Sequence, residues 1–411
     1  MNNIKSIAVV GGGTAGWMSA CYFVKQGFKV TLVESPNVPN IGVGESCLPA
    51  LSFFCEEYLG LKDEDWVPES NAVYKLGIYH YNWREEGSLW KHWFCYDRNN
   101  CDSEWYLNNG KLPPRESRRH SYHIDAIAFG QMLRNRVALP NGVCHTVQHI
   151  DQVQQDEQGN VSGLLLADGT TITADFYIDC SGPAKLLAKT VGIKFEPYGD
   201  IPNDRAIACP QKLEDLGPPN YTITYAAKNG WLWNTALTHR RGCGYTYSSS
   251  FTTDDQALEE YLQYNPSTDL SKLRVLKFDS TYAVNPLEKN VLAVGLASGF
   301  IEPLEATSIY LIQYYIETFG KIINTGRDPR VYNKTVHRLT REMYEFVLST
   351  YTLTQRNDTE YWRYYQDLEK RLDTRSMVLE RASQPDTGEW QGTKLFFPFN
   401  WWSKAKHFGI L

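Results

Sequence analysis

The sequence predicts an α/β protein with a Rossmann-like dinucleotide-binding core, an inserted sheet and a helical C-terminal region. Three features indicate this fold. A glycine-rich turn joins an apolar strand to a helix near the N-terminus, an apolar segment at residues 290–300 returns to the same sheet, and charged and aromatic residues recur at helical spacing over residues 331–379. A strand–turn–helix unit of this kind is typical of parallel sheets that bind a nucleotide.

A βαβ unit opens the chain. Residues 4–10 predict a buried strand, a helix follows, and a second strand ends at Glu34. In the turn, Gly11 permits the tight bend, Gly13 lets a pyrophosphate approach the helix N-terminus, and Gly16 allows the helix to pack closely. Glu34 lies 21 residues after Gly13 and can accept hydrogen bonds from both hydroxyls of a ribose. The unit therefore predicts a dinucleotide site.

Turn signals and alternation define the segments that follow. Three strands of an antiparallel meander are expected at residues 143–151, 161–166 and 170–174, and a buried strand at residues 176–182. Alternating Tyr, Thr and Trp predict the inserted sheet. We expect four segments: the first part of the nucleotide-binding core at 1–197, an inserted substrate-side sheet at 198–280, the return of the core at 281–330, and a helical region covering the substrate site at 331–411.

The composition limits the function classes. The chain has 411 residues, with 41 Lys and Arg against 47 Asp and Glu, so its net charge of −6 gives no basic surface for nucleic acid or a membrane. Its nine cysteines form no C-x-x-C pair and no His/Cys cluster with zinc-ligand spacing, so no metal site is predicted. Scattered thiols without a leader peptide predict a cytoplasmic location, and the many aromatic residues suit a site lined with rings.

Several motifs resemble those of the flavin-dependent halogenases of the tryptophan-halogenase type. The resemblance spans about residues 4 to 365, and the chain is similar in length to the short members of this family that marine viruses encode. The segments that carry it are Gly11 to Trp17, Gly42-Val43-Gly44-Glu45-Ser46 with Pro49, Asp179-Cys180-Ser181-Gly182, Gly299 to Thr307, and the group Arg356, Asp358 and Trp362.

The resemblance implies an FAD-dependent halogenase. Such an enzyme uses reduced flavin (FADH2), O2 and a halide to form hypohalous acid, which is delivered to an electron-rich aromatic substrate of the indole or phenol type. A separate flavin reductase would supply FADH2, because the chain shows no second nucleotide motif, and a homo-oligomer is left open. The implied cofactor contacts are Gly11, Gly13, Thr14, Ala15, Gly16, Glu34, Ser46, Val147 and Leu296.

Two residues match the family's catalytic positions. Lys75, in Tyr74-Lys75-Leu76-Gly77, would hydrogen-bond the oxidant as an ammonium or be halogenated as a neutral amine. Glu305 would polarise the oxidant or accept the proton that the arene loses. Without the resemblance, Lys75 reads as a solvated surface lysine and Glu305 as a helix N-terminal acid, with Glu302 as a neighbouring candidate.

The halide would lie at the start of the helix that follows. The resemblance implies that backbone amides of Thr307 and Ser308 hold it, as helix N-termini hold anions. Ser308 replaces the glycine that the family carries, and we therefore expect bromide or iodide to be preferred to chloride. The C-terminal region is shorter than in tryptophan-specific relatives, which favours a more open site for varied phenols, indoles or anilines.

The sequence is also compatible with two other functions. An aromatic monooxygenase shares the first glycine motif, and Trp231-Leu232-Trp233 departs from the family's W-x-W-x-I-P signature after the second Trp. A flavin-binding redox sensor without turnover is the non-enzymatic alternative. The sequence also gives ordinary structural interpretations to two sets of residues: His80, His120, His123 and His239 as polar or core histidines, and Arg205 as an ion-pair partner or a cofactor contact.

Overall fold

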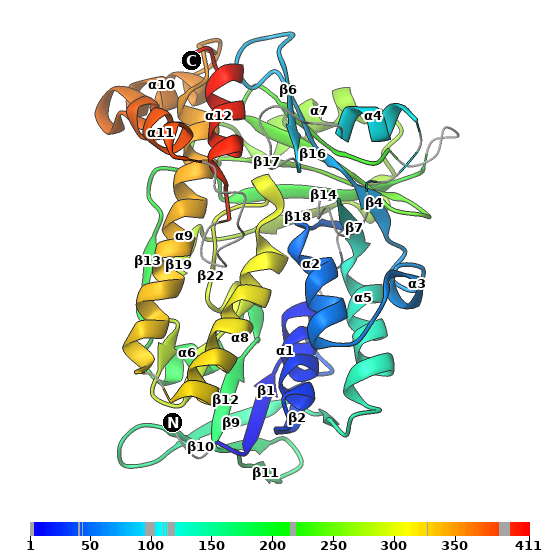
Figure 1. Cartoon of the computed structure of the whole chain (residues 1–411), viewed down its shortest axis with the longest axis vertical. Helices are drawn as coiled ribbons and strands as arrows, with labels where there is room; N and C mark the ends of the chain where they lie inside the picture. The colour runs from blue at the N-terminus through cyan, green and yellow to red at the C-terminus, as the bar shows by residue number, and fades with distance from the viewer. Residues whose placement is uncertain are drawn as a thin grey trace.

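The computed structural model describes most of the chain and arranges it around two large sheets (Figure 1). The described residues are 4–39, 42, 44–94, 103–109, 111, 113, 120–213, 219–326, 328–385 and 395–411. Among them, no helix combines the length and the hydrophobicity that crossing a bilayer requires.

The nucleotide-binding core contains a six-stranded sheet in the order β20-β21-β12-β1-β2-β8. Its strands are β1 (Ser6–Val10), β2 (Lys29–Glu34), β8 (Cys144–Val147), β12 (Phe176–Asp179), β20 (Leu287–Glu288) and β21 (Val291–Ala293). All neighbours pair in parallel except β20 and β21. The helix α1 (Thr14–Lys25) joins β1 to β2, so the predicted βαβ unit is confirmed.

The second large sheet has seven strands in the order β18-β14-β17-β16-β15-β5-β6. They are β5 (Gly77–Tyr81), β6 (Leu89–Trp93), β14 (Arg205–Gln211), β15 (Thr222–Ala226), β16 (Gly230–Ala236), β17 (Arg241–Tyr247) and β18 (Arg274–Lys277). Five come from the predicted inserted segment. The other two, β5 and β6, come from within the segment assigned to the first part of the core, and β5 pairs in parallel with β15. The chain thus crosses between the two sheets before residue 100.

Three small sheets complete the strand set. They are β3 (Gly44–Ser46), β7 (Ser121–Asp125) and β4 (Val73–Lys75); β11 (Thr171–Ile172), β10 (Val161–Leu166) and β9 (Ile150–Gln155); and β13 (Phe195–Pro197), β19 (Thr281–Ala283) and β22 (Gly299–Phe300). The first of them carries Lys75 at the end of β4 and Ser46 at the end of β3, so one central strand, β7, holds both predicted site residues in place.

Helices cover the sheets and dominate the C-terminal third. The α-helices after α1 are α2 (Ala50–Phe53), α3 (Asp63–Trp66), α4 (Ser103–Asn108), α5 (Ala126–Leu133), α6 (Leu186–Thr190), α7 (Asp254–Tyr264), α8 (Ser308–Thr325), α9 (Pro329–Thr352), α10 (Glu360–Leu372), α11 (Thr374–Ser383) and α12 (Pro398–His407). In Figure 1, α8 and α9 run side by side, and α10, α11 and α12 gather at the end of the molecule that holds the seven-stranded sheet.

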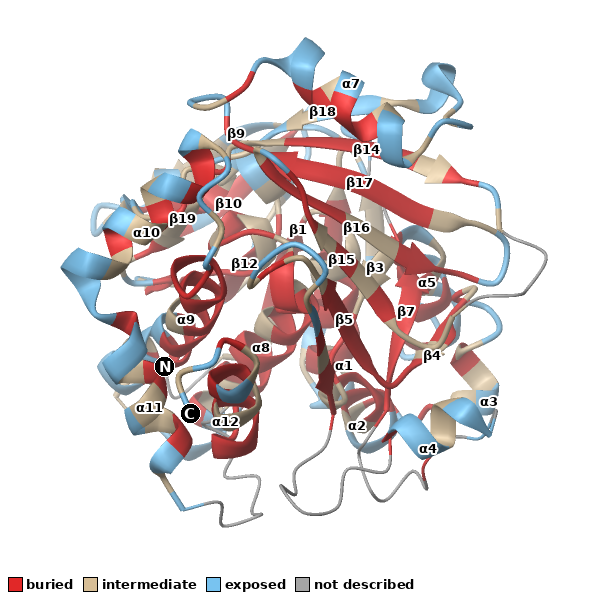
Figure 2. Cartoon of the chain, turned by 90° about the horizontal axis from the view of Figure 1, so that it is seen from above, coloured by how far each residue is buried: buried red, intermediate tan, exposed pale blue. Residues whose placement is uncertain are grey.

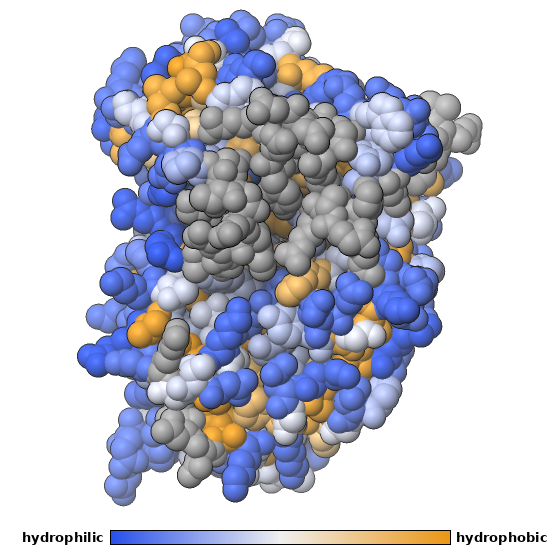
Figure 3. Space-filling model, viewed as in Figure 1, coloured by the Kyte–Doolittle hydropathy of each residue, from blue (hydrophilic) through white to orange (hydrophobic). Residues whose placement is uncertain are grey.

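The core lies between these layers. In Figure 2 the strands β5 and β7 and much of α8 are buried, whereas α11 and α3 carry exposed residues at the edge of the molecule. The view in Figure 3 shows a mainly hydrophilic face with scattered hydrophobic patches. Large aromatic side chains fill much of the interior: Trp66, Trp83, Trp231, Trp362 and Trp401 are among the largest fully buried side chains. Many of the aromatic residues in the sequence therefore pack in the core, whether or not others line a substrate site.

Several predicted strands are shorter in the structure, such as the one expected at 176–182, which ends at Asp179, and two differ more. Residues 143–151 do not form one strand, because β8 pairs in parallel with β2 at the edge of the core sheet, whereas β9 turns away to pair with β10 in the meander. Residues 290–300 form only the three-residue β21 before Gly295, whose φ of 66° ends the strand. The segment then makes a short helical turn, η6 (Gly295–Ala297), before β22.

Candidate active site

The glycine-rich turn packs tightly against the carboxyl end of β12. Gly11 has a φ of 113°, and a Cβ atom there would lie 2.2 Å from the carbonyl oxygen of Cys180. A Cβ atom at Gly16 would lie 1.8 Å from the carbonyl oxygen of Gly11, so both positions require glycine. The N-cap of α1 is Gly13, which offers no side chain to cap the helix, and the first turn contains no acid. The helix N-terminus is therefore suited to bind an anionic group such as a pyrophosphate.

Glu34 lies directly against this turn. Its Oε1 atom is 2.7 Å from Nε2 of His145, and a Cβ atom at Gly12 would lie 1.5 Å from its Oε2 atom. Val147 pairs with Glu34 in the register of β2 and β8, and its side chain is exposed. The carboxylate is thus anchored by a histidine that the sequence analysis did not identify, and it stays beside the turn where a ribose would be held.

The other predicted cofactor residues come from the same neighbourhood or from the Lys75 region. Leu296 lies in η6, and a Cβ atom at the neighbouring Gly295 would lie 2.9 Å from the Cβ atom of Ala15. Thr14 donates its hydroxyl hydrogen to the carbonyl oxygen of Ala126 at 3.3 Å. Phosphate-binding amides, a ribose acceptor and close backbone approach are present together, so the residues fit a dinucleotide such as FAD.

Lys75 is fully buried, so the interpretation as a solvated surface lysine is wrong. Its Nζ atom donates to Oγ of Ser46 at 2.7 Å and to the carbonyl oxygen of Cys47 at 3.2 Å, and it lies 4.8 Å from the centre of the Phe94 ring. Burial lowers the pKa of Lys75 to about 7, against the opposing effects of Cys47 and Glu305. Both the ammonium and the neutral amine are therefore accessible near neutral pH.

Ser46 connects Lys75 to the seven-stranded sheet. Its hydroxyl lies 2.9 Å from Oγ1 of Thr222, which lies 2.8 Å from Nε2 of His123. Nδ1 of His123 is 3.0 Å from the carbonyl oxygen of Ala236, which supports the structural role predicted for this histidine. Ser46, predicted as a cofactor contact, is thus also the hydroxyl that anchors Lys75.

Glu305 is buried in a short helical turn, η7 (Leu304–Ala306), with an unusual backbone. Glu305 and the next residue, Ala306, have φ values of 69° and 56°, in the left-handed region that favours glycine. The carboxylate does not cap the helix that follows. Instead, Oε2 lies 3.0 Å from Nδ1 of His92 and Oε1 lies 3.5 Å from Nε2 of His80.

The charge of Glu305 is set by its neighbours. Burial by itself would raise the pKa of this carboxyl, but His92, His80 and Lys404 lower it to about 2. Burial lowers the pKa of His80 to about 3, so this imidazole is neutral. Lys404 is fully buried on α12, where Nζ donates to Oγ of Ser349 and Oγ1 of Thr350, and burial holds the pKa of this amine well below its usual range.

Two members of this group, His92 and Lys404, were not predicted from the sequence. His80 was predicted only as a polar or core histidine, and it is indeed buried, but it also faces Glu305. His92 is 213 residues from Glu305 in the chain, and no short motif links them. Alternation in β5 and β6 was the available signal, since it places His80 and His92 on one face of paired strands, where they pair directly with Trp90 and Ile78.

Glu302 belongs to a different set of contacts. It accepts hydrogen bonds from the hydroxyl of Tyr351 at 2.6 Å, from Nδ2 of Asn203 at 2.8 Å and from Nε1 of Trp231 at 3.5 Å. Burial raises the pKa of Glu302 to about 7, although these donors oppose the effect. The carboxylate is held on three sides by fixed donors, which favours a structural role for Glu302 and leaves Glu305 as the candidate acid.

The tryptophan pair and Arg205 also find structural partners. The ring centres of Trp231 and Trp233 lie 6.0 Å apart on β16, with Trp231 buried and Trp233 half-buried. Arg205 forms an ion pair with Asp204 at 2.6 Å, which favours the structural interpretation of this residue. His239 lies 3.8 Å from Asp125, close to a second ion pair between Arg240 and the same carboxylate.

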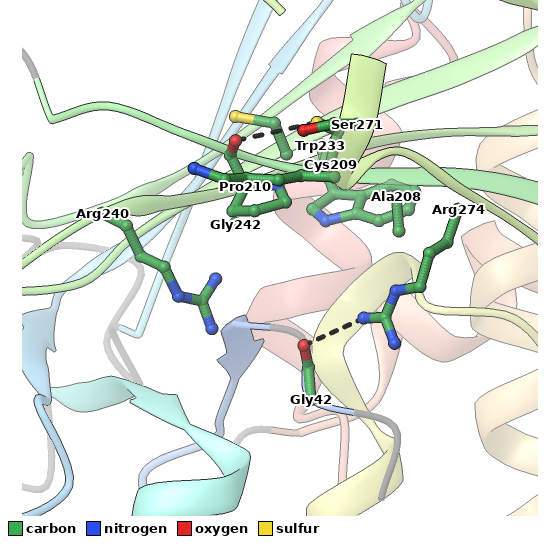
Figure 4. Close-up of a pocket in the computed structure, with 11 residues that line it drawn as sticks. Gly42, Ala208, Cys209, Pro210, Trp233, Arg240, Gly242, Ser271 and Arg274 are labelled. Atoms are coloured by element: carbon green, nitrogen blue, oxygen red, sulfur yellow. Dashed lines mark hydrogen bonds between the residues drawn. The ribbon is translucent and has the colours of Figure 1, made fainter. Parts of the chain in front are cut away.

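A cavity of about 400 Å³ lies beside Gly42, next to the segment that resembles the family's second motif (Figure 4). Arg240 and Arg274 approach it from opposite sides, and Arg274 donates to the carbonyl oxygen of Gly42 at 3.3 Å. The indole of Trp233 forms part of its wall. The guanidinium groups give this cavity hydrogen-bond donors for an anionic group.

The start of α8 carries the predicted halide residues. Thr307 is the buried N-cap of α8 and Ser308 is its first residue; the helix has no side-chain cap and no acid in its first turn. These two residues directly follow Glu305 and Ala306. The predicted anion-binding end of α8 thus follows the turn that carries Glu305 directly in the sequence.

Comparisons with known proteins agree on one family. The chain matches the family described as Tryptophan halogenase over residues 6–108 and 105–406. Tryptophan 6-halogenase SttH from Streptomyces toxytricini is 30% identical over 428 residues, which cover 88% of this chain and 80% of that protein. Xcc4156, a flavin-dependent halogenase from Xanthomonas campestris, has a TM-score of 0.90 at 29% identity, covering 99% of this chain and 89% of that one. BrvH, a flavin-dependent halogenase from Brevundimonas sp. BAL3, has a TM-score of 0.85 at 28% identity, covering 100% and 90%.

Proposed function

The chain belongs to the tryptophan halogenase family of FADH2-dependent halogenating enzymes, and from this premise we propose that it halogenates a small electron-rich arene of the indole or phenol type at Lys75. The observation that carries the proposal is the fully buried Lys75, held by Ser46 and Cys47 beside an aromatic ring. A lysine in this position has no structural ion pair to explain it among the described residues. Its ammonium is expensive to bury, which favours a chemical role.

Lys75 has the chemistry to guide the oxidant. Reduced FAD, when bound, would supply two electrons to O2, and the halide would supply the other two, so that hypohalous acid and water form. The Nζ atom of Lys75 can then donate a hydrogen bond to that acid as an ammonium, or accept the halogen as a neutral amine. A pKa of about 7 makes both forms available, and the bonds to Ser46 and Cys47 fix where the nitrogen points.

Glu305 acts in this scheme as a fixed negative charge. Its pKa of about 2 keeps it ionised, and an arene that has just taken up a halogen is a much stronger acid than this carboxyl group. Both roles considered for Glu305, polarising the oxidant and accepting the proton of the arene, use this ionised form. Buried among imidazoles and away from water, the charge acts through a low local dielectric.

The remaining assignments extend the same proposal. The residues Gly11, Gly13, Thr14, Ala15, Gly16, Glu34, Ser46, Val147 and Leu296 would hold FAD, and backbone amides at Thr307 and Ser308 would hold the halide, with bromide or iodide preferred. The sheet at 198–280 and the helices at 331–411 would enclose the substrate. A separate reductase would supply FADH2. The relative from Streptomyces toxytricini is a tryptophan 6-halogenase, and the substrate proposed for this chain is the broader class of indoles and phenols.

A product-mass experiment tests the function. The enzyme, FAD, a flavin reductase and NADH are mixed with bromide, chloride or iodide and a panel of indoles, phenols and anilines, and products are read by mass spectrometry. Arene that gains one halogen supports the proposal. Arene that gains oxygen instead supports the aromatic monooxygenase. Oxidation of reduced flavin with unchanged arene across the panel would support the redox sensor and overturn the proposal.

A further inference from the structure

We propose that Asn400, on the C-terminal helix α12, is a positioning residue for Glu305: its amide fixes which nitrogen of His92 carries the proton, and His92 donates that proton to the carboxylate. The relevance of this contact to halogenation rests on the proposed function of Glu305. The contact itself is a property of three buried side chains that come from β6, η7 and α12.

The orientation of the Asn400 amide is set by its own helix. Asn400 occupies the third position of α12, and its Oδ1 atom accepts the backbone N–H of Phe397, the N-cap, at 2.8 Å. Because Oδ1 is the acceptor in this capping bond, the other end of the amide must be the NH2 group. That nitrogen lies 3.0 Å from Nε2 of His92.

The amide then determines the tautomer of His92. An amide NH2 group can only donate, so Nε2 of His92 must accept, and a neutral imidazole that accepts at Nε2 carries its proton on Nδ1. Nδ1 lies 3.0 Å from Oε2 of Glu305. The proton therefore points at the carboxylate, and a bond from a neutral donor to an ionised acceptor is among the stronger hydrogen bonds in proteins.

His80 faces the second oxygen of Glu305 in a matching way. Its Nδ1 atom lies 2.7 Å from Oγ1 of Thr224, which already accepts the indole N–H of Trp83 at 2.9 Å. The Thr224 hydroxyl can therefore donate to Nδ1, which places the proton of His80 on Nε2, 3.5 Å from Oε1 of Glu305 and without a hydrogen bond to it. Of the two contacts, the hydrogen bond is the one from His92 to Oε2, and Asn400 determines its donor.

The same three side chains could be mistaken for a metal site. One atom from each of His80, His92 and Glu305 lies within 4.8 Å of the others. A metal at this point would need the lone pair of Nδ1 of His92, and therefore a proton on Nε2, which would face the NH2 group of Asn400. Turning the amide around would break the bond from Phe397. The geometry thus favours a hydrogen-bonded relay.

The variant Asn400→Asp separates the two functions of the amide. An aspartate keeps an oxygen for the N–H of Phe397, and an acid is favourable in the first turn of a helix, so α12 should remain folded. Its other oxygen would accept from His92, where the amide donates. We expect His92 to move its proton to Nε2 or to become doubly protonated, and its hydrogen bond to Glu305 to be lost or altered.

Nitrogen NMR of the full chain reads this directly. The protein is labelled with 15N-histidine, and the His92 signals are assigned by their loss in His92→Gln. Wild type should show a proton of His92 on Nδ1 and none on Nε2, and Asn400→Asp should show a proton on Nε2. A wild-type His92 protonated on Nε2, or a His92 tautomer that is unchanged in Asn400→Asp, overturns the proposal. The wild-type spectrum alone is decisive if the variant fails to fold.

Kinetics with the holoenzyme connect the contact to the reaction. For Asn400→Asp we expect kcat for halogenated product to fall by about 10-fold, since residues that orient a catalytic group often contribute 10–100-fold. The KM for the arene and the affinity for FAD should stay within about 2-fold of wild type. The control Lys406→Gln makes the same change in net charge on an exposed position of α12 and should leave kcat unchanged.

The two proposals fail in different ways. Equal kcat values for wild type and Asn400→Asp, in spite of an altered His92 tautomer, would show that Asn400 does not position the reaction. A wild type that forms no halogenated product would refute the proposed function, and the NMR result would still decide whether Asn400 controls His92.

Discussion

The nucleotide-binding turn and the Glu305 cluster (His80, His92, Glu305 and Asn400) are built in opposite ways. The turn, its helix and the acid that follows come from one continuous segment between Ser6 and Glu34. The cluster takes His80 and His92 from neighbouring strands, Glu305 from a strained turn and Asn400 from the last helix, 308 residues after His92. The first region is encoded by local spacing and the second by tertiary packing. Flavin binding and halogen transfer should therefore be separable by mutation.

The largest effect should come from the Lys75 side. Lys75→Ala should reduce halogenated product by about 10²–10⁴-fold, because the group that positions the oxidant is removed. FAD affinity and O2 consumption should change little, since Lys75 lies outside the glycine-rich turn. Single-turnover mixing of reduced enzyme with O2, halide and excess arene measures each of these quantities.

Lys75→Arg is the matched control for charge. A guanidinium stays protonated and cannot form the same haloamine, so this variant should also be inactive. If Lys75→Ala yields product at a rate near that of wild type, the role assigned to Lys75 is wrong and the division between the two regions is not real.

The next effect should come from Glu305→Gln. The amide keeps the size of the side chain but removes the charge, and we expect kcat to fall by about 10²-fold, as for the loss of one electrostatic contact in a dry site. The Kd for FAD, from fluorescence titration, should match wild type. An unchanged kcat would contradict the electrostatic role. A matched Glu302→Gln should alter stability more than kcat, because Glu302 serves a structural network.

Glu34→Ala should have the opposite effect on the glycine-rich turn: it should weaken FAD binding and leave halogen transfer intact. Loss of the ribose hydrogen bonds should weaken FAD binding by about 1–3 kcal/mol, which corresponds to a roughly 5- to 150-fold rise in Kd. With FAD in excess, kcat for product should return to the wild-type value. His145→Gln, which loses only the partner of Glu34, should have a smaller effect on Kd. A Kd equal to that of wild type would remove Glu34 from the cofactor site.

The pH dependence of halogen transfer sharpens the role of Lys75. The pKa of Lys75 is lowered to about 7 by burial, so the neutral amine increases as pH rises through that value. If the neutral amine takes the halogen, the single-turnover rate should rise by about 10-fold between pH 6 and pH 8 and then level off. A rate that falls over the same range would assign the reaction to the ammonium. Glu305, with a pKa of about 2, stays ionised throughout and contributes no step in this range.

The smallest effect should come from Ser308→Gly. The serine side chain at the first position of α8 is expected to alter the halide site, so its removal should move the ratio of brominated to chlorinated product toward chloride by a few-fold. Direct competition between the two halides, read by mass spectrometry, measures this ratio. A wild type that already favours chloride would contradict the expectation.

The segment that depends on local spacing could be predicted from the sequence, whereas the contacts between distant segments could not. The strands β1 and β2 and the helix between them were predicted, because each is determined by neighbours within a few residues. The join between β8 and β9 was not, because which sheet a short strand enters depends on the open edge beside β2. Lys75 and Glu305 could be named only through the family motifs. Burial of Lys75, and the partners His92 and Asn400, depend on contacts between distant segments that no local pattern records.

The backbone at Glu305 and Ala306 has a consequence for engineering this protein. Two successive non-glycine residues with positive φ cost roughly 1–2 kcal/mol each relative to glycine. A search that selects only for heat resistance should therefore favour Glu305→Gly or Ala306→Gly, and the first of these would remove the carboxylate that we propose to be catalytic while relieving the backbone strain. Directed evolution of a more durable catalyst should select survivors on product formation as well as melting temperature.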